Sequence, residues 1–167
     1  MNKRSRANGV TTTGAAEQPW LPPRWVIRFA WKAHRALYAV TRGRVGLWAA
    51  RSGRSGMMRV TTTGRRSGRE RAVILAYLED GPNLVTLAMN GWGAAEPAWW
   101  LNLRAHPAAK VDLADGTRDV VARAATGTER ARLWDLWGAV DENLDEYARR
   151  RPNETAVVVL EPRPAAD

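Results

Sequence analysis

The clearest chemical signal in this sequence is a run of arginines between two apolar segments. Residues 61–71 read TTTGRRSGRER, and two glycines bound a turn that holds most of the charge. Glycine allows a tight turn and a close approach of the backbone to a ligand, and guanidinium groups match phosphate oxygens in pairs. Backbone N–H groups in such a turn can also form a concave anion-binding nest. The segment predicts a phosphate-holding β-hairpin, although a solvated basic turn explains the same residues equally well.

A second candidate site lies downstream, where a strand is expected to end beside a short helix. Residues 88–100 read AMNGWGAAEPAWW, with a glycine-containing turn after the strand and a helix starting at Pro97. Amides at such a strand end can hydrogen-bond ring carbonyls, and an indole can exclude water. The pattern predicts a site for a flat heteroaromatic ring. At least one of Trp99 and Trp100 is nevertheless expected to be ordinary core.

Composition excludes several other kinds of chemistry. The chain of 167 residues has no cysteine, so disulfides, thiolate metal sites and cysteine nucleophiles cannot occur. Its two histidines, His34 and His106, lie far apart without a carboxylate cluster, so no metal site is expected. A GxGxxG motif is also absent, which argues against a Rossmann nicotinamide site.

The net charge of +9 is unevenly distributed. Residues 1–71 hold 16 Lys and Arg against 2 acidic residues, whereas residues 72–167 hold 10 against 15. The first part is therefore suited to meet an anion such as a phosphorylated cofactor, a lipid headgroup or a nucleic acid. Because no nucleic-acid recognition motif accompanies the charge, a nucleic-acid partner is not expected.

The chain divides into three parts. Residues 1–19 are polar and without pattern, which predicts a disordered tail. Residues 20–56 hold an amphipathic helix, about 24–40, and a glycine- and arginine-rich connector, and residues 57–167 form the cofactor-binding domain. The helix is expected to cover its own domain, while contact with an anionic membrane at its inner face stays an alternative. With no secretory signal and no run of about 18 apolar residues, we expect a cytoplasmic protein.

The predicted elements indicate an α+β fold whose antiparallel sheet curls into a barrel. Strands are expected at about 57–63, 70–79, 83–89, 109–114, 117–125 and 155–162. A short helix is expected over 97–106, and a long helix over 126–149, before the last strand. Thr126 and Glu129 fit a capping box at the start of the long helix. Its apolar stripe predicts core positions at Leu133, Leu136, Trp137, Val140, Leu144 and Tyr147.

Four strings in this order, TTTGRRSGRER, AMNGWG, PAWWLNLRAHP and AVVVLEP, resemble the deazaflavin-dependent nitroreductase family. The resemblance covers about residues 57–162. It implies a split β-barrel, FMN-binding-like fold and coenzyme F420, an 8-hydroxy-5-deazaflavin with a phosphate and an oligoglutamate tail. It also implies hydride transfer from the reduced coenzyme to a small electron-poor acceptor such as a quinone, an enone or a nitro compound. The protein would be a monomer or a homodimer.

The resemblance also implies roles for individual residues. The phosphate and tail would be held by Arg65, Arg66, Ser67, Gly68 and Arg71. The ring would be contacted by Val73 and Ile74 along its length, by the backbone of Ala88, Met89 and Asn90 at its polar edge, and by Ala98 and Trp99 as a cover. Some members of the family have tyrosine where Ala76 stands. Tyr77 is next to it, but strand alternation predicts that it points to the opposite face. The proton would come from solvent or, as a weaker candidate, from Tyr147.

Two other interpretations of the sequence remain open. An oxidoreductase related to pyridoxamine oxidases would keep the split barrel and bind FMN instead. A non-catalytic module would carry lipids or cofactor at a membrane surface, using the basic helix at 24–40.

Overall fold

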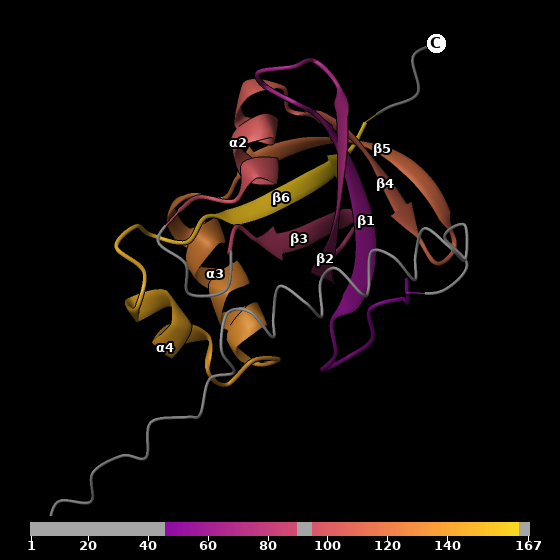
Figure 1. Ribbon diagram of the computed structural model, residues 1–167. Coiled ribbons are helices and arrows are strands. Elements are labelled where there is room, and N and C mark those ends of the chain that lie inside the picture. Colours follow the sequence, from indigo (N-terminus) through magenta and orange to yellow (C-terminus); the bar gives the residue numbers. More distant parts are fainter. Residues whose placement is uncertain (1–45, 90–94, 164–167) are drawn as a thin grey trace, which may run out of the picture.

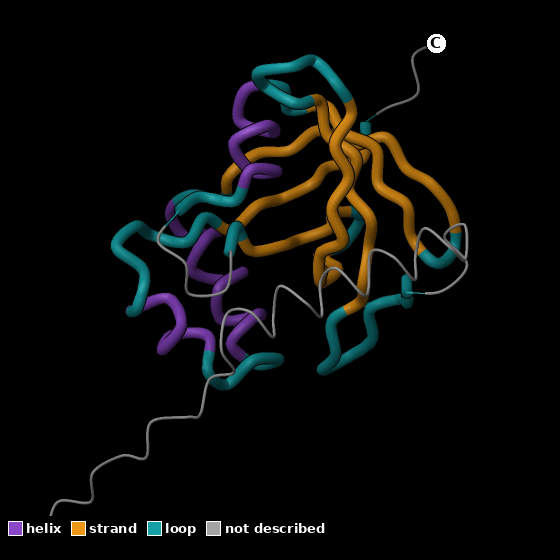
Figure 2. The backbone as a smooth tube through the Cα atoms, in the orientation of Figure 1, coloured by secondary structure: helices purple, strands orange, loops and turns teal. Residues whose placement is uncertain are grey.

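Six antiparallel strands close into a barrel in the computed structural model, which describes residues 46–89 and 95–163 (Figures 1 and 2). The strand order around the barrel is β1-β2-β3-β6-β5-β4, and β4 pairs with β1 to close it. The strands are β1 Gly56–Thr63, β2 Glu70–Asp80, β3 Asn83–Leu87, β4 Ala108–Leu113, β5 Gly116–Ala124 and β6 Val157–Pro162. The predicted fold class is confirmed.

Alternation along the strands separates an inner from an outer face. In β1, buried and half-buried residues alternate without exception, and Met58 and Val60 point into the barrel. The chain alternates in this way because successive strand side chains point to opposite faces. In β6, residues 157–160 are all fully buried, because both of its faces are covered. Val158 and Leu160 belong to the barrel interior, whereas Val157 and Val159 belong to a second cluster outside it.

Within residues 46–89 and 95–163, three helices pack around the barrel: α2 Ala98–Ala105, α3 Gly127–Gly138 and α4 Leu144–Arg149. The outer face of β3 and β6 is covered by the buried residues of α3, Leu133 and Trp137, together with Leu144 of α4. Helix α2 lies elsewhere, beside β1, β2 and β5 (Figure 1). Its residues Trp99, Trp100 and Leu103 contribute to the barrel interior.

The single long helix predicted over 126–149 is wrong, since α3 and α4 are separate. The N–H groups of Val140 and Asp141 both donate to the carbonyl of Trp137, at 3.0 and 2.9 Å, which tightens the chain into a turn. The Asp141 carboxylate then accepts the N–H of Asn143 at 3.1 Å. Such local side-chain bonds offer the backbone an alternative to the helix. Leu136, predicted as core, is 37% exposed because it lies at the edge of the apolar stripe.

The capping box predicted at Thr126 and Glu129 is also wrong. Thr126 occupies the N-cap position, but its side chain makes no capping hydrogen bond. The Glu129 carboxylate instead accepts two hydrogen bonds from Arg123, at 2.6 and 2.7 Å. A bidentate ion pair is stronger than the single hydrogen bond that the carboxylate would accept from a backbone N–H in a capping box. Arg123 also donates to Glu161 at 2.8 Å, so it joins β5, α3 and β6.

Several predictions fall outside the described residues. They are the tail at 1–19, the helix at 24–40 and the ring contact of Asn90. The described part of the connector runs alongside β1, where Trp48 forms a β-bridge with Met57. In the part of the chain that the structure describes, no helix is both long enough and apolar enough to cross a membrane.

Candidate functional site

The β1–β2 turn is built by its two glycines. The N–H of Gly64 donates to the carbonyl of Arg69 at 2.8 Å, and the Gly64 carbonyl accepts from Ser67 and Gly68 at 3.1 and 2.7 Å. A Cβ at Gly64 would lie 2.9 Å from the Ser67 hydroxyl oxygen. Gly68 has φ +64°, which non-glycine residues rarely adopt. Because the amides of Ser67 and Gly68 donate hydrogen bonds within the turn, they cannot contribute to the predicted backbone nest. The exposed arginine side chains of the turn stay the main candidates for binding an anion.

The side chains predicted to hold the phosphate and tail are exposed, and they lie at one end of the barrel. They are Arg65, Arg66, Ser67 and Arg71, with Arg69 between them. None of these arginines forms an ion pair with another described residue. By contrast, Arg59, Arg123 and Arg132 each pair with a carboxylate. The hairpin therefore presents an open basic surface, where an elongated anion could lie without displacing an internal partner.

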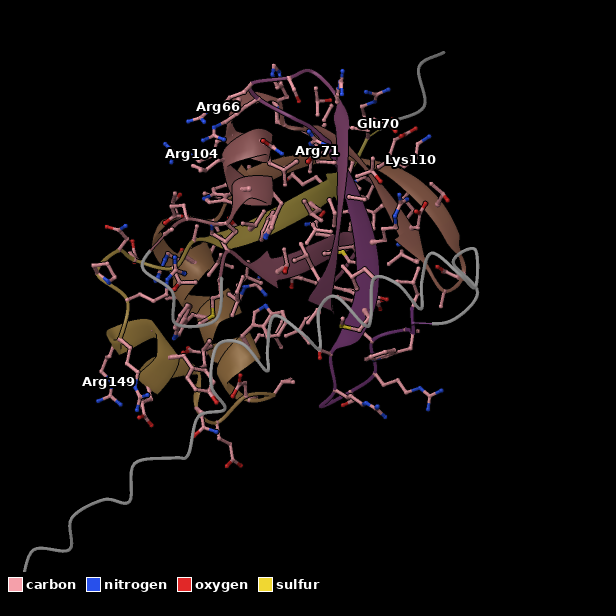
Figure 3. All side chains as sticks on the ribbon, viewed as in Figure 1. Arg66, Glu70, Arg71, Arg104, Lys110 and Arg149 are labelled. Atoms are coloured by element: carbon pink, nitrogen blue, oxygen red, sulfur yellow. The ribbon has the colours of Figure 1, made fainter. Side chains whose placement is uncertain are left out.

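Further cations lie at the same end of the molecule. Figure 3 shows Arg66 and Arg104, the latter near the end of α2, beside the top of that helix. Lys110 on β4 is paired with Thr61 on β1, next to the hairpin. The carboxylate of Glu70 at the start of β2 is exposed in the same region. Positive charge thus exceeds negative charge at this end, which favours anions.

Asn102 of α2 anchors the hairpin and was not among the residues predicted from the sequence. Its Oδ1 accepts the backbone N–H of Arg65 at 3.1 Å, and its Nδ2 donates to the hydroxyl of Thr62 at 3.2 Å. The Thr62 hydroxyl in turn donates to the carbonyl of Arg71 at 3.2 Å. Asn102 and Thr62 are 6% and 2% exposed, so the network is shielded from water. The available signal was an amide within the apolar string PAWWLNL.

Both tryptophans of α2 are core residues. Trp99 and Trp100 are 8% and 7% exposed, with ring centroids 6.3 Å apart. The expectation that at least one belongs to the core is confirmed. Trp99 is buried, so a ligand could contact only a small part of its ring. Ala98, which precedes it, is exposed and accessible to a ligand. Their role as a cover for the ring stays a prediction.

The end of β3 leaves few backbone groups for a ligand. The N–H of Ala88 donates to the carbonyl of Ala156 at 2.9 Å, and the N–H of Met89 donates to Leu87 at 2.8 Å. The carbonyl of Ala88 already accepts a hydrogen bond from Arg151 at 2.7 Å. The amides of Ala88 and Met89 are therefore both used within the protein, while the third predicted backbone contact, Asn90, lies outside the described residues.

The two β2 residues predicted to lie along the ring point to opposite faces. Val73 packs against the barrel interior, whereas Ile74, 3% exposed, pairs with Arg59 across the sheet and faces outward. One flat ring can contact only one of these side chains. The prediction that Tyr77 faces away from Ala76 is confirmed, since Tyr77 lies in the interior and Ala76 in the outer cluster.

Tyr77 is structural. Its hydroxyl accepts the N–H of Ala50 at 3.3 Å, and a Cβ at Gly56 would lie 2.5 Å from its ring. Burial raises the pKa of the Tyr77 hydroxyl above its usual range. Tyr147, the predicted proton donor, is half-buried on α4, which lies far from the arginine hairpin (Figure 1). Its catalytic role remains a prediction.

Both the sequence and the fold of this chain are similar to those of known proteins. Residues 31–162 match the family described as F420H(2)-dependent quinone reductase. The F420H(2)-dependent quinone reductase Rv1261c of Mycobacterium tuberculosis is 28% identical over 132 residues, which cover 77% of this chain and 87% of that protein. A solved F420-H2 dependent reductase (FDR-A) superposes with a TM-score of 0.58 at 29% identity, over 63% of this chain and 93% of that one. A structure described as a domain-swapped dimer superposes with a TM-score of 0.60 at 25% identity, over 80% of this chain and 99% of that one.

Proposed function

Because the chain belongs to the F420H(2)-dependent quinone reductase family, we propose that it transfers a hydride from reduced coenzyme F420 to a quinone. The reduced deazaflavin supplies the hydride, and a proton completes the reduction of the quinone to a hydroquinone. The observation that carries the proposal is the family match over residues 31–162 together with the hairpin arginines inside that range. Enones and nitro compounds are further candidate acceptors of the same electron-poor class.

The arginine hairpin fits the anionic part of this coenzyme. Arg65, Arg66 and Arg71 are exposed and unpaired within the described ranges, so binding a phosphate or carboxylate breaks no internal ion pair. Guanidinium groups suit both anions, since each can donate two parallel hydrogen bonds. The open surface also suits a flexible chain of carboxylates better than a closed cavity would. We assign these arginines to the phosphate and the oligoglutamate tail.

Helix α2 connects the arginine hairpin with the predicted ring-binding residues. Asn102, near its middle, holds the hairpin through the amide of Arg65. Ala98 and Trp99, at its N-terminal end, are two of the residues assigned to the ring. Asn102 lies four residues after Ala98, which is about 6 Å along the helix axis. It therefore fixes the spacing between the phosphate end and the ring end of the proposed site.

An anaerobic assay tests this function. Reduced F420 should be reoxidised on addition of a soluble naphthoquinone, as followed by the return of deazaflavin absorbance. Arg66→Gln and Arg71→Gln should raise KM for the coenzyme about tenfold while kcat changes little, because each removes a charge-assisted contact far from the reacting ring. Arg150→Gln, an exposed arginine at the end of α4, serves as the matched control. Failure of the wild-type chain to reoxidise F420H2 with quinone, enone and nitro acceptors alike would refute the proposal.

The oligomeric state and membrane contact are separate proposals. We propose a homodimer, since one structural neighbour is described as a domain-swapped dimer; light scattering after gel filtration would decide it. Contact of residues 24–40 with an anionic membrane is supported by the sequence pattern alone. Co-sedimentation with anionic vesicles, compared with a variant carrying Arg28→Glu and Lys32→Glu, would test it.

A further inference from the structure

Arg151, just after α4, is a buried arginine that the proposed function does not yet use. Its side chain is fully excluded from solvent. Its Nη1 donates to the carbonyl of Ala88 at 2.7 Å and to the hydroxyl of Thr155 at 2.9 Å. The preceding Arg150 is exposed and pairs with Glu146 one helical turn away. Two adjacent arginines thus have opposite environments, and only Arg151 reaches the end of β3.

Arg151 is also paired, at longer range, with a carboxylate on another segment. Its Nη2 lies 3.7 Å from Oε1 of Glu96, which precedes α2 and is 22% exposed. Among the described residues, Nε and Nη2 of Arg151 and Oε2 of Glu96 have no hydrogen-bond partner. A buried ion pair with unsatisfied donors contributes little to stability, because desolvation of both charges offsets their attraction. The stabilising effect of the ion pair with Glu96 therefore does not by itself explain why Arg151 is buried here.

The contacts of Arg151 join the segments that carry the predicted ring contacts. One contact is with Ala88, next to Met89 at the end of β3, and the other is with Glu96, two residues before Ala98 at the start of α2. We infer that Arg151 is a positioning residue, which holds these two segments at a fixed separation and so pre-organises the wall of the ring site. This inference rests on the proposed function, because it takes the ring of F420 as the ligand. Binding sites gain affinity when supporting contacts fix their geometry in advance.

The test compares four single variants of the full chain. Arg151→Met removes the charge but keeps an unbranched side chain, and Arg151→Lys keeps the charge and a donor for the Ala88 carbonyl. Glu96→Gln keeps the shape of the partner but removes its charge. Arg150→Met is the matched control at the neighbouring, exposed position. Two quantities are measured for each: the dissociation constant for F420, and the hydrogen exchange rate of the Ala88 amide in the absence of coenzyme.

We expect Arg151→Met to raise the dissociation constant about tenfold or more and to speed exchange at Ala88. Glu96→Gln should raise the dissociation constant several-fold, and Arg151→Lys should stay within about threefold of the wild type. Arg150→Met should change neither quantity. In all variants, half-saturation with the quinone should change little, since the acceptor is not what Arg151 positions.

Three results would overturn the inference. The first is an unchanged dissociation constant in a folded Arg151→Met variant, even if Ala88 exchanges faster, since the role of Arg151 would then be structural only. The second is an equal loss of affinity in Arg150→Met. The third applies if Arg151→Met does not fold: it is an unchanged dissociation constant for F420 in the Glu96→Gln variant. A wild-type chain without affinity for F420 would instead refute the proposed function, and exchange at Ala88 would still show whether Arg151 fixes the strand end.

Discussion

Asn102 provides a sharp test of how the barrel holds its arginine hairpin. Replacing it by leucine, which has nearly the same volume, removes the hydrogen bonds to Arg65 N–H and to the Thr62 hydroxyl, at 3.1 and 3.2 Å. Each such bond contributes about 0.5–1.5 kcal/mol net, and a buried group left unpaired costs about 1–3 kcal/mol. Thr62 is 2% exposed, but its hydroxyl keeps the hydrogen bond that it donates to the Arg71 carbonyl, and the exposed hairpin lets water reach the Arg65 amide, so neither group is left without a partner. From the two lost hydrogen bonds we expect Asn102→Leu to lower the free energy of unfolding by about 1–3 kcal/mol.

A double-mutant cycle separates stability from positioning. Thr62→Val removes the hydroxyl with little change of shape, and in the Asn102→Leu background it removes the acceptor that the first change deprives of its donor. Replacing both partners of a hydrogen bond by apolar groups costs less than the sum of the two single changes, so the stability losses of Asn102→Leu and Thr62→Val should not add in the double variant. The double variant should not regain affinity for F420, because the amide of Arg65 still lacks its anchor. Urea denaturation gives the stabilities, and fluorescence titration gives the affinities.

Either of two results would show that Asn102 lacks this role. If Asn102→Leu unfolds at the same urea concentration as the wild type, the network contributes nothing to stability. If the double variant binds F420 as tightly as the wild type, Asn102 does not position the hairpin. Leu101→Ala, on the same helix but half-buried, is the control for a general loss of helix packing.

Two further predictions concern the backbone and the pH dependence of stability. Gly68→Ala should lower the free energy of unfolding by about 1 kcal/mol, because φ is +64° but nothing lies within 4 Å of the added Cβ. Gly64→Ala should lower it more, since its Cβ would lie 3.0 Å from the carbonyl oxygen of Arg69. Urea midpoints of the two variants compare them, and equal losses would contradict this. The hydrogen bonds from Arg123 lower the pKa of Glu129, so Glu129 contributes stability above its unfolded-state pKa and loses it as the pH falls through the lower folded value. Glu129→Gln should therefore reduce the loss of stability with falling pH below about pH 5, with the slope near neutrality unchanged. An unaltered slope on the acid side would contradict the assignment.

The strands could be predicted from the sequence because their patterns are local. Alternation in β1 and the turns at Gly81 and Gly116, both with positive φ, fix where neighbouring strands start and end. The predicted bounds accordingly agree with the structure to within two residues. The break between α3 and α4 was missed because it depends on an aspartate turn at Asp141, which competes with a helical pattern that continues on either side.

The family resemblance could be predicted for a similar reason, and the match over residues 31–162 confirms it. Its motifs are short strings, read without knowing which residues meet in space. The supporting contacts could not be predicted in this way. Arg151 is one of three consecutive arginines, and its buried hydrogen bond to the carbonyl of Ala88 distinguishes it from Arg149 and Arg150. The use of the Ala88 amide by Ala156 likewise depends on the pairing of distant segments.

The central claim is that the exposed arginine hairpin binds the anionic part of coenzyme F420. A fluorescence titration with F420 and, separately, with FMN measures this directly on the wild-type chain and on a chain carrying Arg65→Gln, Arg66→Gln and Arg71→Gln. We predict tighter binding of F420 than of FMN, and a loss of at least about 100-fold in F420 affinity in the triple variant, since each lost contact is worth roughly 1.5–3 kcal/mol. Equal F420 affinity in the two chains, or preferential binding of FMN, would contradict the account.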